Sequence, residues 1–149
     1  MKVVIFCGGL GTRLREETEF RPKPMVPVGN RPILWHIMKI YAHYGHKDFI
    51  LCLGYKGEVI KDYFRHYHWN TSDVTLSLGS NPTVTYHTHH AEEDWNVTLL
   101  DTGQETQTGG RLRRALPYID SDTFLATYGD GLANSNINES IAFHKQHGG

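Results

Sequence analysis

Apolar positions along the chain fall into two repeating patterns, and their alternation predicts the secondary structure. Short apolar runs bounded by turns occur at Lys2–Cys7, Asp48–Leu53 and Thr123–Thr127. Such runs are typical of strands that are buried on both faces of a parallel sheet. Between the runs, Pro32–Gly45 and Glu58–His68 place apolar residues at steps of three and four, which predicts amphipathic helices. Strands that alternate with helices through short connections favour an α/β fold with right-handed crossovers.

The middle of the chain has a different composition. Three segments rich in Val, Thr and Tyr, at Val74–Leu78, Thr83–Thr88 and Trp95–Leu100, predict further strands, some of them antiparallel. A short helix with a glycine-rich start is expected at Thr108–Pro117, and a last helix at Ile137–Gln146. The fold class predicted is therefore α/β, a Rossmann-like and mostly parallel sheet flanked by helices. We interpret residues 1–149 as one domain that is incomplete at its C-terminus, because a parallel sheet normally continues with another strand after a helix.

Net charge and the lengths of the apolar segments exclude some classes of protein. The formal net charge is −1 over 149 residues, so the chain lacks the basic field of a nucleic-acid-binding protein. Of the short basic run formed by Arg111, Arg113 and Arg114, two members are expected to face water on a helix. No apolar segment is long enough for a membrane span. The two cysteines, Cys7 and Cys52, lie in apolar runs, which favours buried free thiols in a reducing cytoplasm.

A glycine-rich turn follows the first predicted strand. Residues 7–23 read CGGLGTRLREETEFRPK, in which Gly8, Gly9 and Gly11 precede two cations, Arg13 and Lys23. Glycines let backbone N–H groups approach anionic oxygens without a Cβ in the way. An arginine adds a planar fork of donors, and a lysine adds a mobile point charge. The turn therefore predicts a polyphosphate site, and the polar segment Leu14–Arg31 is expected to be a loop across it.

Two common phosphate-binding motifs do not fit this turn. A P-loop consists of a glycine, four further residues and then Gly-Lys-Ser/Thr, whereas Gly11 is followed by Thr12 and Arg13. In the dinucleotide fingerprint G-x-G-x-x-G, Gly9 and Gly11 could be the first two glycines, but position 14, where the third is required, is occupied by leucine. A glycine-rich strand end without any ligand is the remaining structural alternative.

A second candidate site residue is Asp130, within Gly129-Asp130-Gly131. It follows the predicted strand Thr123–Thr127, and ligands of open α/β sheets bind where the parallel strands end. A lone carboxylate there suits Mg²⁺, which combines one or two carboxylates with phosphate oxygens. The alternative is an ordinary turn in which the aspartate serves local hydrogen bonds.

With these residues in place, the whole chain resembles the sugar-1-phosphate nucleotidyltransferases, also called nucleotide-sugar pyrophosphorylases. The glycine turn with Pro22-Lys23-Pro24 and the Gly129-Asp130 pair are similar to the superfamily at large. The runs ILWHIMKIY (33–41) and WNVT (95–98) resemble one branch, the glucose-1-phosphate cytidylyltransferases. Further supporting segments are Gly54–Gly57, Asp101–Gly103 and Thr108–Leu112.

The resemblance implies a set of site residues. In such enzymes the first turn holds the base, ribose and triphosphate, and a lysine contacts the phosphates. A segment before and at a second glycine pair lies against the base. An aspartate binds Mg²⁺ together with another aspartate near the far end of the full chain. The implied nucleotide-binding residues here are Phe6, Cys7, Gly8, Gly9, Leu10, Gly11, Thr12, Arg13, Lys23, Glu105, Gly110 and Gly129, and the implied metal ligand is Asp130.

The resemblance also implies an activity. A glucose 1-phosphate oxygen would attack the α-phosphorus of CTP, giving CDP-glucose for polysaccharide biosynthesis and releasing pyrophosphate. Arg13, Lys23 and Asp130 would carry catalysis through phosphate and metal contacts, in the cytoplasm, without nucleic-acid or membrane partners. A homo-oligomer is expected at full length, compatible with an exposed aromatic stripe at Trp35, Tyr41 and Tyr44. Two alternatives stay open: another nucleotide or sugar 1-phosphate, and a nucleotide-binding fragment without turnover.

Overall fold

The centre of the molecule is a parallel sheet. The structure, a computed structural model, describes residues 1–8, 21–87, 94–103, 108–119 and 123–129. Four strands pair in the order β7-β4-β1-β8, and every neighbouring pair is parallel. The strands are β1 (Lys2–Cys7), β4 (Asp48–Leu53), β7 (Asn96–Asp101) and β8 (Leu125–Tyr128). The predicted α/β fold class with a parallel sheet is confirmed.

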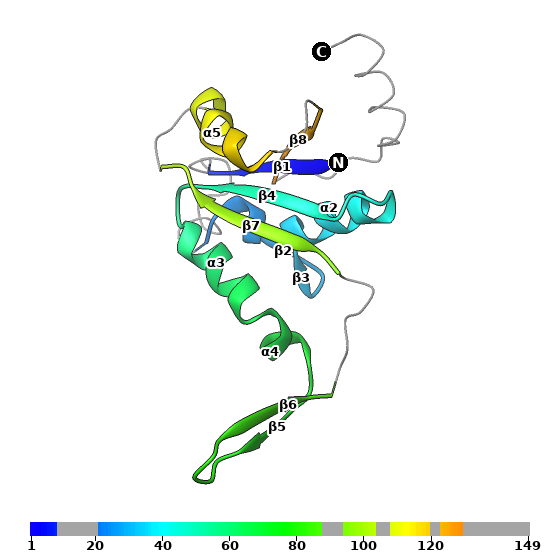
Figure 1. The fold of residues 1–149 in the computed structure, drawn as a ribbon, viewed down its shortest axis with the longest axis vertical. Coiled ribbons are helices and arrows are strands. Elements are labelled where there is room, and N and C mark those ends of the chain that lie inside the picture. The colour runs from blue at the N-terminus through cyan, green and yellow to red at the C-terminus, as the bar shows by residue number, and fades with distance from the viewer. Residues whose placement is uncertain (9–20, 88–93, 104–107, 120–122, 130–149) are drawn as a thin grey trace.

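Helices cover both faces of this sheet. Helices α2 (Ile33–His43) and α3 (Gly57–Arg65) lie on one face, and α5 (Thr108–Ala115) lies on the other (Figure 1). Successive side chains of a strand point to opposite faces, so β1 contributes Val3 and Ile5 to the core under α2 and contributes Val4 to the core under α5. All three side chains are fully buried. Burial on both faces explains why this strand is an unbroken apolar run.

Several boundaries differ from the sequence prediction. The helix expected over Glu58–His68 is two helices, α3 and α4 (Tyr67–Thr71). They separate at His66, whose φ of −103° and ψ of 18° lie outside helical values. The loop expected over Leu14–Arg31 contains secondary structure in its described part. Its elements are the 3-10 helix η1 (Lys23–Met25), strand β2 (Pro27–Val28) and the first residue of β3 (Arg31–Pro32).

The segment after Lys23 is held to the helices by an arginine. The Arg31 guanidinium lies 4.7 Å from the Trp35 ring centroid and 5.4 Å from that of Tyr67. It donates to the Tyr67 hydroxyl at 3.1 Å, and the Trp35 indole N–H donates to the same oxygen at 3.1 Å. Trp35, Tyr41 and Tyr44 are all half-buried, so the expected exposed aromatic stripe is wrong. Tyr41 packs against the core, the Trp35 ring lies near Trp95, and the Tyr44 ring lies near His43.

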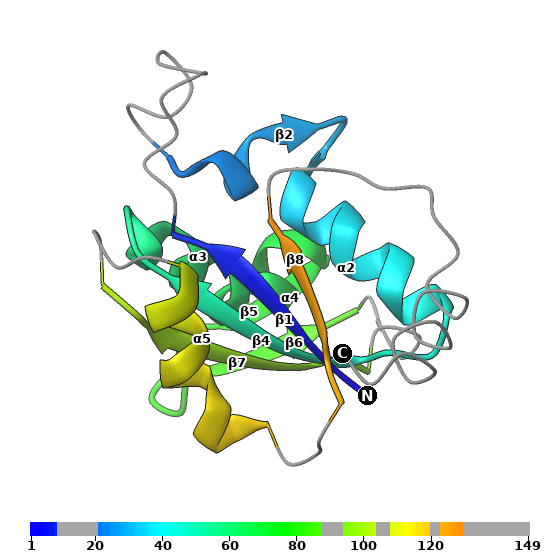
Figure 2. The ribbon, with the colours of Figure 1, turned by 90° about the horizontal axis from the view of Figure 1, so that it is seen from above.

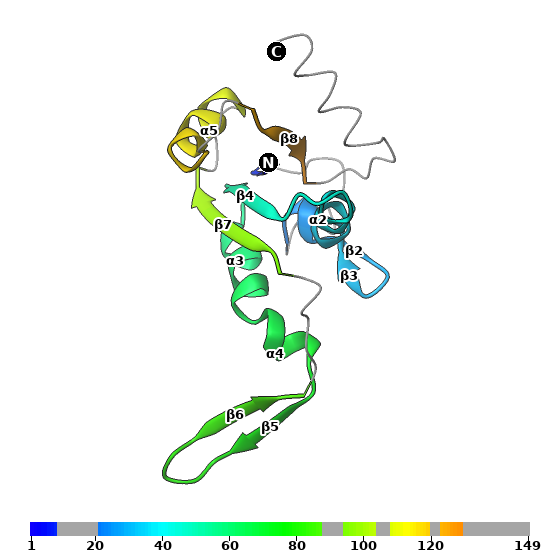
Figure 3. The same ribbon diagram turned by 45° about the vertical axis from the view of Figure 1, so that its right-hand side comes forward.

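An antiparallel ribbon projects away from the sheet. Strands β5 (Val74–Ser77) and β6 (Thr83–Tyr86) pair with each other and form a sheet of their own (Figures 1 and 3). This confirms the predicted antiparallel strands. Leu76 lies opposite Val84 in the register, and 45% and 47% of these side chains are exposed.

The helix predicted over Thr108–Pro117 ends earlier than expected, at Ala115, whereas the two cysteines are as predicted. A second 3-10 helix, η2 (Leu116–Tyr118), follows α5. Cys7 and Cys52 are buried and free, as predicted. Within the described ranges, none of the helices has the length and apolar character needed to span a membrane. The predicted helix Ile137–Gln146 lies outside the described residues.

Candidate functional site

The carboxyl ends of the four parallel strands form one edge of the sheet. Because the strands are parallel, Cys7, Leu53, Asp101 and Tyr128 end β1, β4, β7 and β8 at this common edge (Figure 2). In open α/β sheets this is the edge at which ligands bind. The residues that follow β1 and β8 are glycines of the two predicted site motifs, Gly8 and Gly129.

Gly129 joins three segments of the predicted site. Its backbone N–H donates to the carbonyl oxygen of Phe6 at 3.0 Å. A methyl group added at Gly129 would lie 3.1 Å from the Cys7 sulfur and 3.2 Å from Cγ of Pro24, so only a hydrogen fits without a shift of its neighbours. The end of β8 is therefore packed against the end of β1 and against η1, on which Lys23 neighbours the buried Pro24.

The structure brings together part of the predicted residue set. Phe6, Cys7, Gly8, Lys23 and Gly129 belong to segments that meet at the carboxyl edge. Gly110 lies on α5, one residue before a side chain that reaches the same edge. The other predicted residues lie outside the described residues: Gly9, Leu10, Gly11, Thr12, Arg13, Glu105 and Asp130.

The sequence did not reveal that Arg111 of α5 donates hydrogen bonds to groups at three strand ends of this edge. Arg113 and Arg114 face water as predicted, but only 5% of Arg111 is exposed. Its Nη2 donates to the carbonyl oxygen of Gly8 at 3.1 Å. Its Nη1 donates to the hydroxyl of Thr102 at 2.8 Å and to the carbonyl oxygen of Leu53 at 3.3 Å. One guanidinium thus links the ends of β1, β4 and β7.

Two glycines leave the space that this guanidinium occupies. A methyl group built on Gly8 would overlap the Arg111 guanidinium. At Gly54 such a group would lie 2.6 Å from Nη1 of Arg111 and 2.8 Å from the carbonyl oxygen of Gly103. Burial lowers the pKa of Arg111, but a guanidinium titrates so far above neutrality that the side chain stays charged. A sequence signal existed, since Arg111 stands four residues before the buried Ala115 and so shares its helix face.

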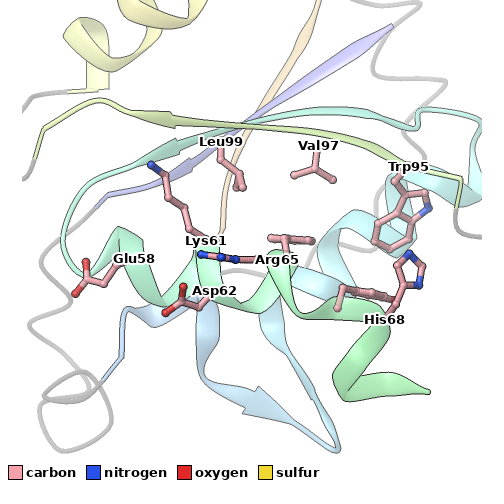
Figure 4. Close-up of a pocket in the computed structure, with 10 residues that line it drawn as sticks. Glu58, Lys61, Asp62, Arg65, His68, Trp95, Val97 and Leu99 are labelled. Atoms are coloured by element: carbon pink, nitrogen blue, oxygen red, sulfur yellow. The ribbon is translucent and has the colours of Figure 1, made fainter. Parts of the chain in front are cut away.

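Pockets lined by described residues lie near the sheet, and they differ in their relation to the predicted site. A pocket of about 600 Å³ lies between α3, α4 and β7, with Val97 and Leu99 on its strand side (Figure 4). A smaller pocket of about 160 Å³ lies at the ends of β4 and β7, beside Gly54 and Asp101. Among the residues that the structure describes, none of the predicted nucleotide-binding residues lines the larger pocket. We therefore build the site on the carboxyl edge, where the predicted glycines and lysine meet, rather than on the larger hollow.

Metal ligands are sparse in the described part of the site. No group of three or more His, Cys, Asp or Glu side chains suited to a metal occurs among the described residues.

A parallel sheet covered by helices on both faces, with glycines and a lysine at its carboxyl edge, defines the class of α/β nucleotide-binding domains. Within that class, the family model described as nucleotidyl transferase matches residues 2–149, and the chain belongs to this family.

Three relatives illustrate the similarity. The chain is 56% identical over 149 residues to glucose-1-phosphate cytidylyltransferase of Salmonella typhimurium. The aligned region covers 99% of this chain and 57% of that protein. It is 50% identical over 148 residues to the probable glucose-1-phosphate cytidylyltransferase of Bacillus subtilis, with 99% and 57% covered. Among solved structures, it is similar to HddC from Yersinia pseudotuberculosis complexed with GMP-PN, at a TM-score of 0.67 and 26% identity, with 96% and 53% covered. The chain thus spans little more than half the length of these relatives.

Proposed function

We propose that the protein containing this chain transfers a cytidylyl group from CTP to α-D-glucose 1-phosphate. The products would be CDP-glucose and pyrophosphate. The observation that carries this proposal is the 56% identity, over 99% of the chain, to a glucose-1-phosphate cytidylyltransferase. The packing of the Gly8, Gly129 and Lys23 segments around one sheet edge supports it, because the nucleotide would bind there.

The proposed reaction is an in-line displacement at phosphorus. A phosphate oxygen of glucose 1-phosphate forms the new bond to the α-phosphorus of CTP, and the bond to the bridging oxygen breaks. Both electrons of that bond leave with pyrophosphate. No covalent protein intermediate is required, so the side chains act by positioning the reactants and offsetting their charge.

Each predicted site residue receives a role in this proposal. The turn Phe6–Arg13 holds the nucleotide, with Arg13 on the β- and γ-phosphates. Lys23 offsets charge on the α-phosphate and on the departing pyrophosphate. Glu105 and Gly110 lie against the base, and Gly129 borders the nucleotide. The position of Lys23 on η1, next to the Pro24 that packs on Gly129, is compatible with this role.

We propose that Asp130 supplies a carboxylate for Mg²⁺. One carboxylate is sufficient where a nucleotide supplies phosphate oxygens, and Asp130 follows Gly129 in the sequence. Gly129 is fixed by its hydrogen bond to Phe6 at the edge where the triphosphate would lie. Asp130 would hold the ion, which when bound neutralises charge on the phosphate oxygens.

A different nucleotide is the second candidate, and one observation favours it. The solved HddC, at 26% identity, is complexed with GMP-PN, a guanine nucleotide analogue. Base choice rests on a few hydrogen bonds in a pocket, so members of one fold can differ in it. A nucleotide-binding fragment without turnover is the third candidate, since the chain spans 57% of its curated relatives.

Assembly and location belong to the same proposal. We expect the full-length protein to form a homo-oligomer, which the exposed apolar side chains of the β5–β6 ribbon support. The buried free thiols fit the reducing cytoplasm, in which we expect the protein to act. We expect neither nucleic acid nor membrane among the partners, in accord with the net charge of −1.

The test is pyrophosphate release by the complete encoded protein across four nucleoside triphosphates and several sugar 1-phosphates. CTP with glucose 1-phosphate should give the highest kcat/KM. Lys23→Met should lower kcat by about 100-fold, the size of effect found when one charge-stabilising donor is removed. The control Lys39→Met changes an exposed lysine of α2 and should leave kcat unchanged. A higher kcat/KM with another triphosphate would overturn the base assignment, and binding without turnover would favour the third candidate.

A further inference from the structure

Arg111 is a buried charged side chain that the proposed mechanism does not use. It reaches from α5 across the carboxyl edge and donates to groups on three different strand ends. Its partner Thr102 is fully buried, and the Thr102 hydroxyl in turn donates to the carbonyl oxygen of Leu53 at 2.8 Å. A planar guanidinium with several donors in a fixed fork can hold such a set together, which one ammonium cannot do.

The contact with Gly8 links Arg111 to the predicted phosphate site. Gly8 is the first residue after β1 and the first glycine of the predicted phosphate turn. Its carbonyl oxygen accepts from Nη2 of Arg111, so the guanidinium fixes the peptide plane from which the turn departs. Hydrogen bonds from a charged donor are stronger than neutral ones, especially away from water. Gly8, from which the turn begins, is therefore linked to α5 through one side chain.

We infer that Arg111 is a positioning residue for nucleotide binding, which orients the glycine turn after β1 through the Gly8 carbonyl without needing to touch the nucleotide. The inference rests on the proposed function, because it assumes that the turn holds a nucleoside triphosphate. It also explains the glycines at 8 and 54, since a side chain at either position would displace the guanidinium.

The test compares CTP affinity among variants of the complete encoded protein, by calorimetric titration with Mg²⁺ present. Arg111→Met removes the guanidinium and should raise the Kd for CTP at least about tenfold, because a misdirected turn loses contacts that act in both ground and transition states. For the same reason KM should rise more than kcat falls. Arg111→Lys should recover only part of the affinity, since an ammonium lacks the fork.

A matched variant separates positioning from general stability. Leu112 is the next residue of α5 and packs in the core with Val4, Ile50 and Cys52. Leu112→Ala should lower the unfolding temperature at least as much as Arg111→Met, yet leave the Kd within about twofold, because its partners lie in the core rather than at the turn. If Arg111→Met does not fold, Thr102→Val takes its place. This variant keeps the residue volume, removes one acceptor of the guanidinium and should weaken CTP binding several-fold.

The outcomes distinguish two failures. If the unmodified protein binds none of the four nucleoside triphosphates, the proposed function is contradicted. If it binds CTP or another of the four, and Arg111→Met or its substitute Thr102→Val binds that nucleotide equally well, the positioning role alone is overturned. Equal loss of affinity in Leu112→Ala and Arg111→Met would also overturn it, because Arg111 would then act only through stability.

Discussion

Burial changes the acid–base chemistry of one thiol at the residue scale. Cys52 is fully buried between Val4, Ile50 and Ala115, and its S–H donates weakly to the carbonyl oxygen of Arg111 at 3.8 Å. Burial raises the pKa of this thiol from 9.0 to about 11, although the nearby Arg111 guanidinium opposes the rise. The thiol is therefore neutral throughout the physiological range, and neutral thiols are poor nucleophiles.

We predict that Cys52 reacts with iodoacetamide along a pH profile displaced to high pH. In native protein, labelling followed by mass spectrometry should rise around pH 11, whereas in urea it should rise near 9.0. The pKa of the Cys52 thiol is higher in the folded protein than in the unfolded chain. The contribution of this thiol to the free energy of unfolding is therefore complete below pH 9 and is lost as pH rises through about 11. Cys52→Ala should remove that part of the alkaline decline. Native labelling with a midpoint near 9.0 would contradict the prediction.

Gly8 shows what the sequence alone can and cannot predict about a single residue. The sequence predicts that this glycine approaches a bound phosphate, whereas in the structure its missing side chain leaves room for Arg111. The partner is 103 residues away in sequence, so spacing alone could not reveal it. Local patterns encode faces and turns, whereas a contact between distant segments depends on the assembled sheet.

At the scale of elements, the spacing of apolar residues along the chain predicted most of the described helices and strands. The two buried strands β1 and β4 have the predicted bounds, because an apolar run flanked by turns leaves few alternatives. The break at His66 was missed because the apolar spacing continues through it to Tyr67. The short β2–β3 pair was also missed, since its paired residues include two prolines, Pro27 and Pro32, which are uncommon in strands.

The β5–β6 ribbon has one apolar and one polar face. Val74, Leu76, Val84 and Tyr86 occupy opposed positions on one face, and Thr75 and Thr85 occupy the other. A two-stranded hairpin is marginally stable alone in water, and this one exposes its apolar face. A second copy of the chain covering that face would account for both observations.

We predict that charges on this face disrupt assembly. In light-scattering measurements after gel filtration, the complete protein should be an oligomer, and Leu76→Lys with Val84→Lys should give a smaller species. The matched control, Thr75→Lys with Thr85→Lys, adds the same charge to the polar face and should keep the mass. A monomeric unmodified protein, or equal masses for both double variants, would contradict this role for the ribbon.

At the scale of the whole molecule, topology converts distant motifs into one candidate site. Parallel strands place the residues after β1 and β8 at the same edge, although about 120 residues separate Gly8 from Gly129. The sequence predicted that these two strand ends meet. In the structure they are joined by the hydrogen bond from Gly129 to Phe6, and Gly129 also packs against Pro24. The catalytic assignments of Arg13, Lys23 and Asp130 remain predictions.

We propose that this edge binds a triphosphate together with a divalent ion held by Asp130. The most direct measurement is calorimetric titration of CTP into the complete protein, with and without Mg²⁺. Mg²⁺ should strengthen CTP binding at least about tenfold, and Asp130→Asn should remove that gain, because an amide is a poor ligand for a hard cation. Asp101→Asn, at the end of β7, is the matched control and should keep the gain. An undiminished Mg²⁺ effect in Asp130→Asn would contradict the account.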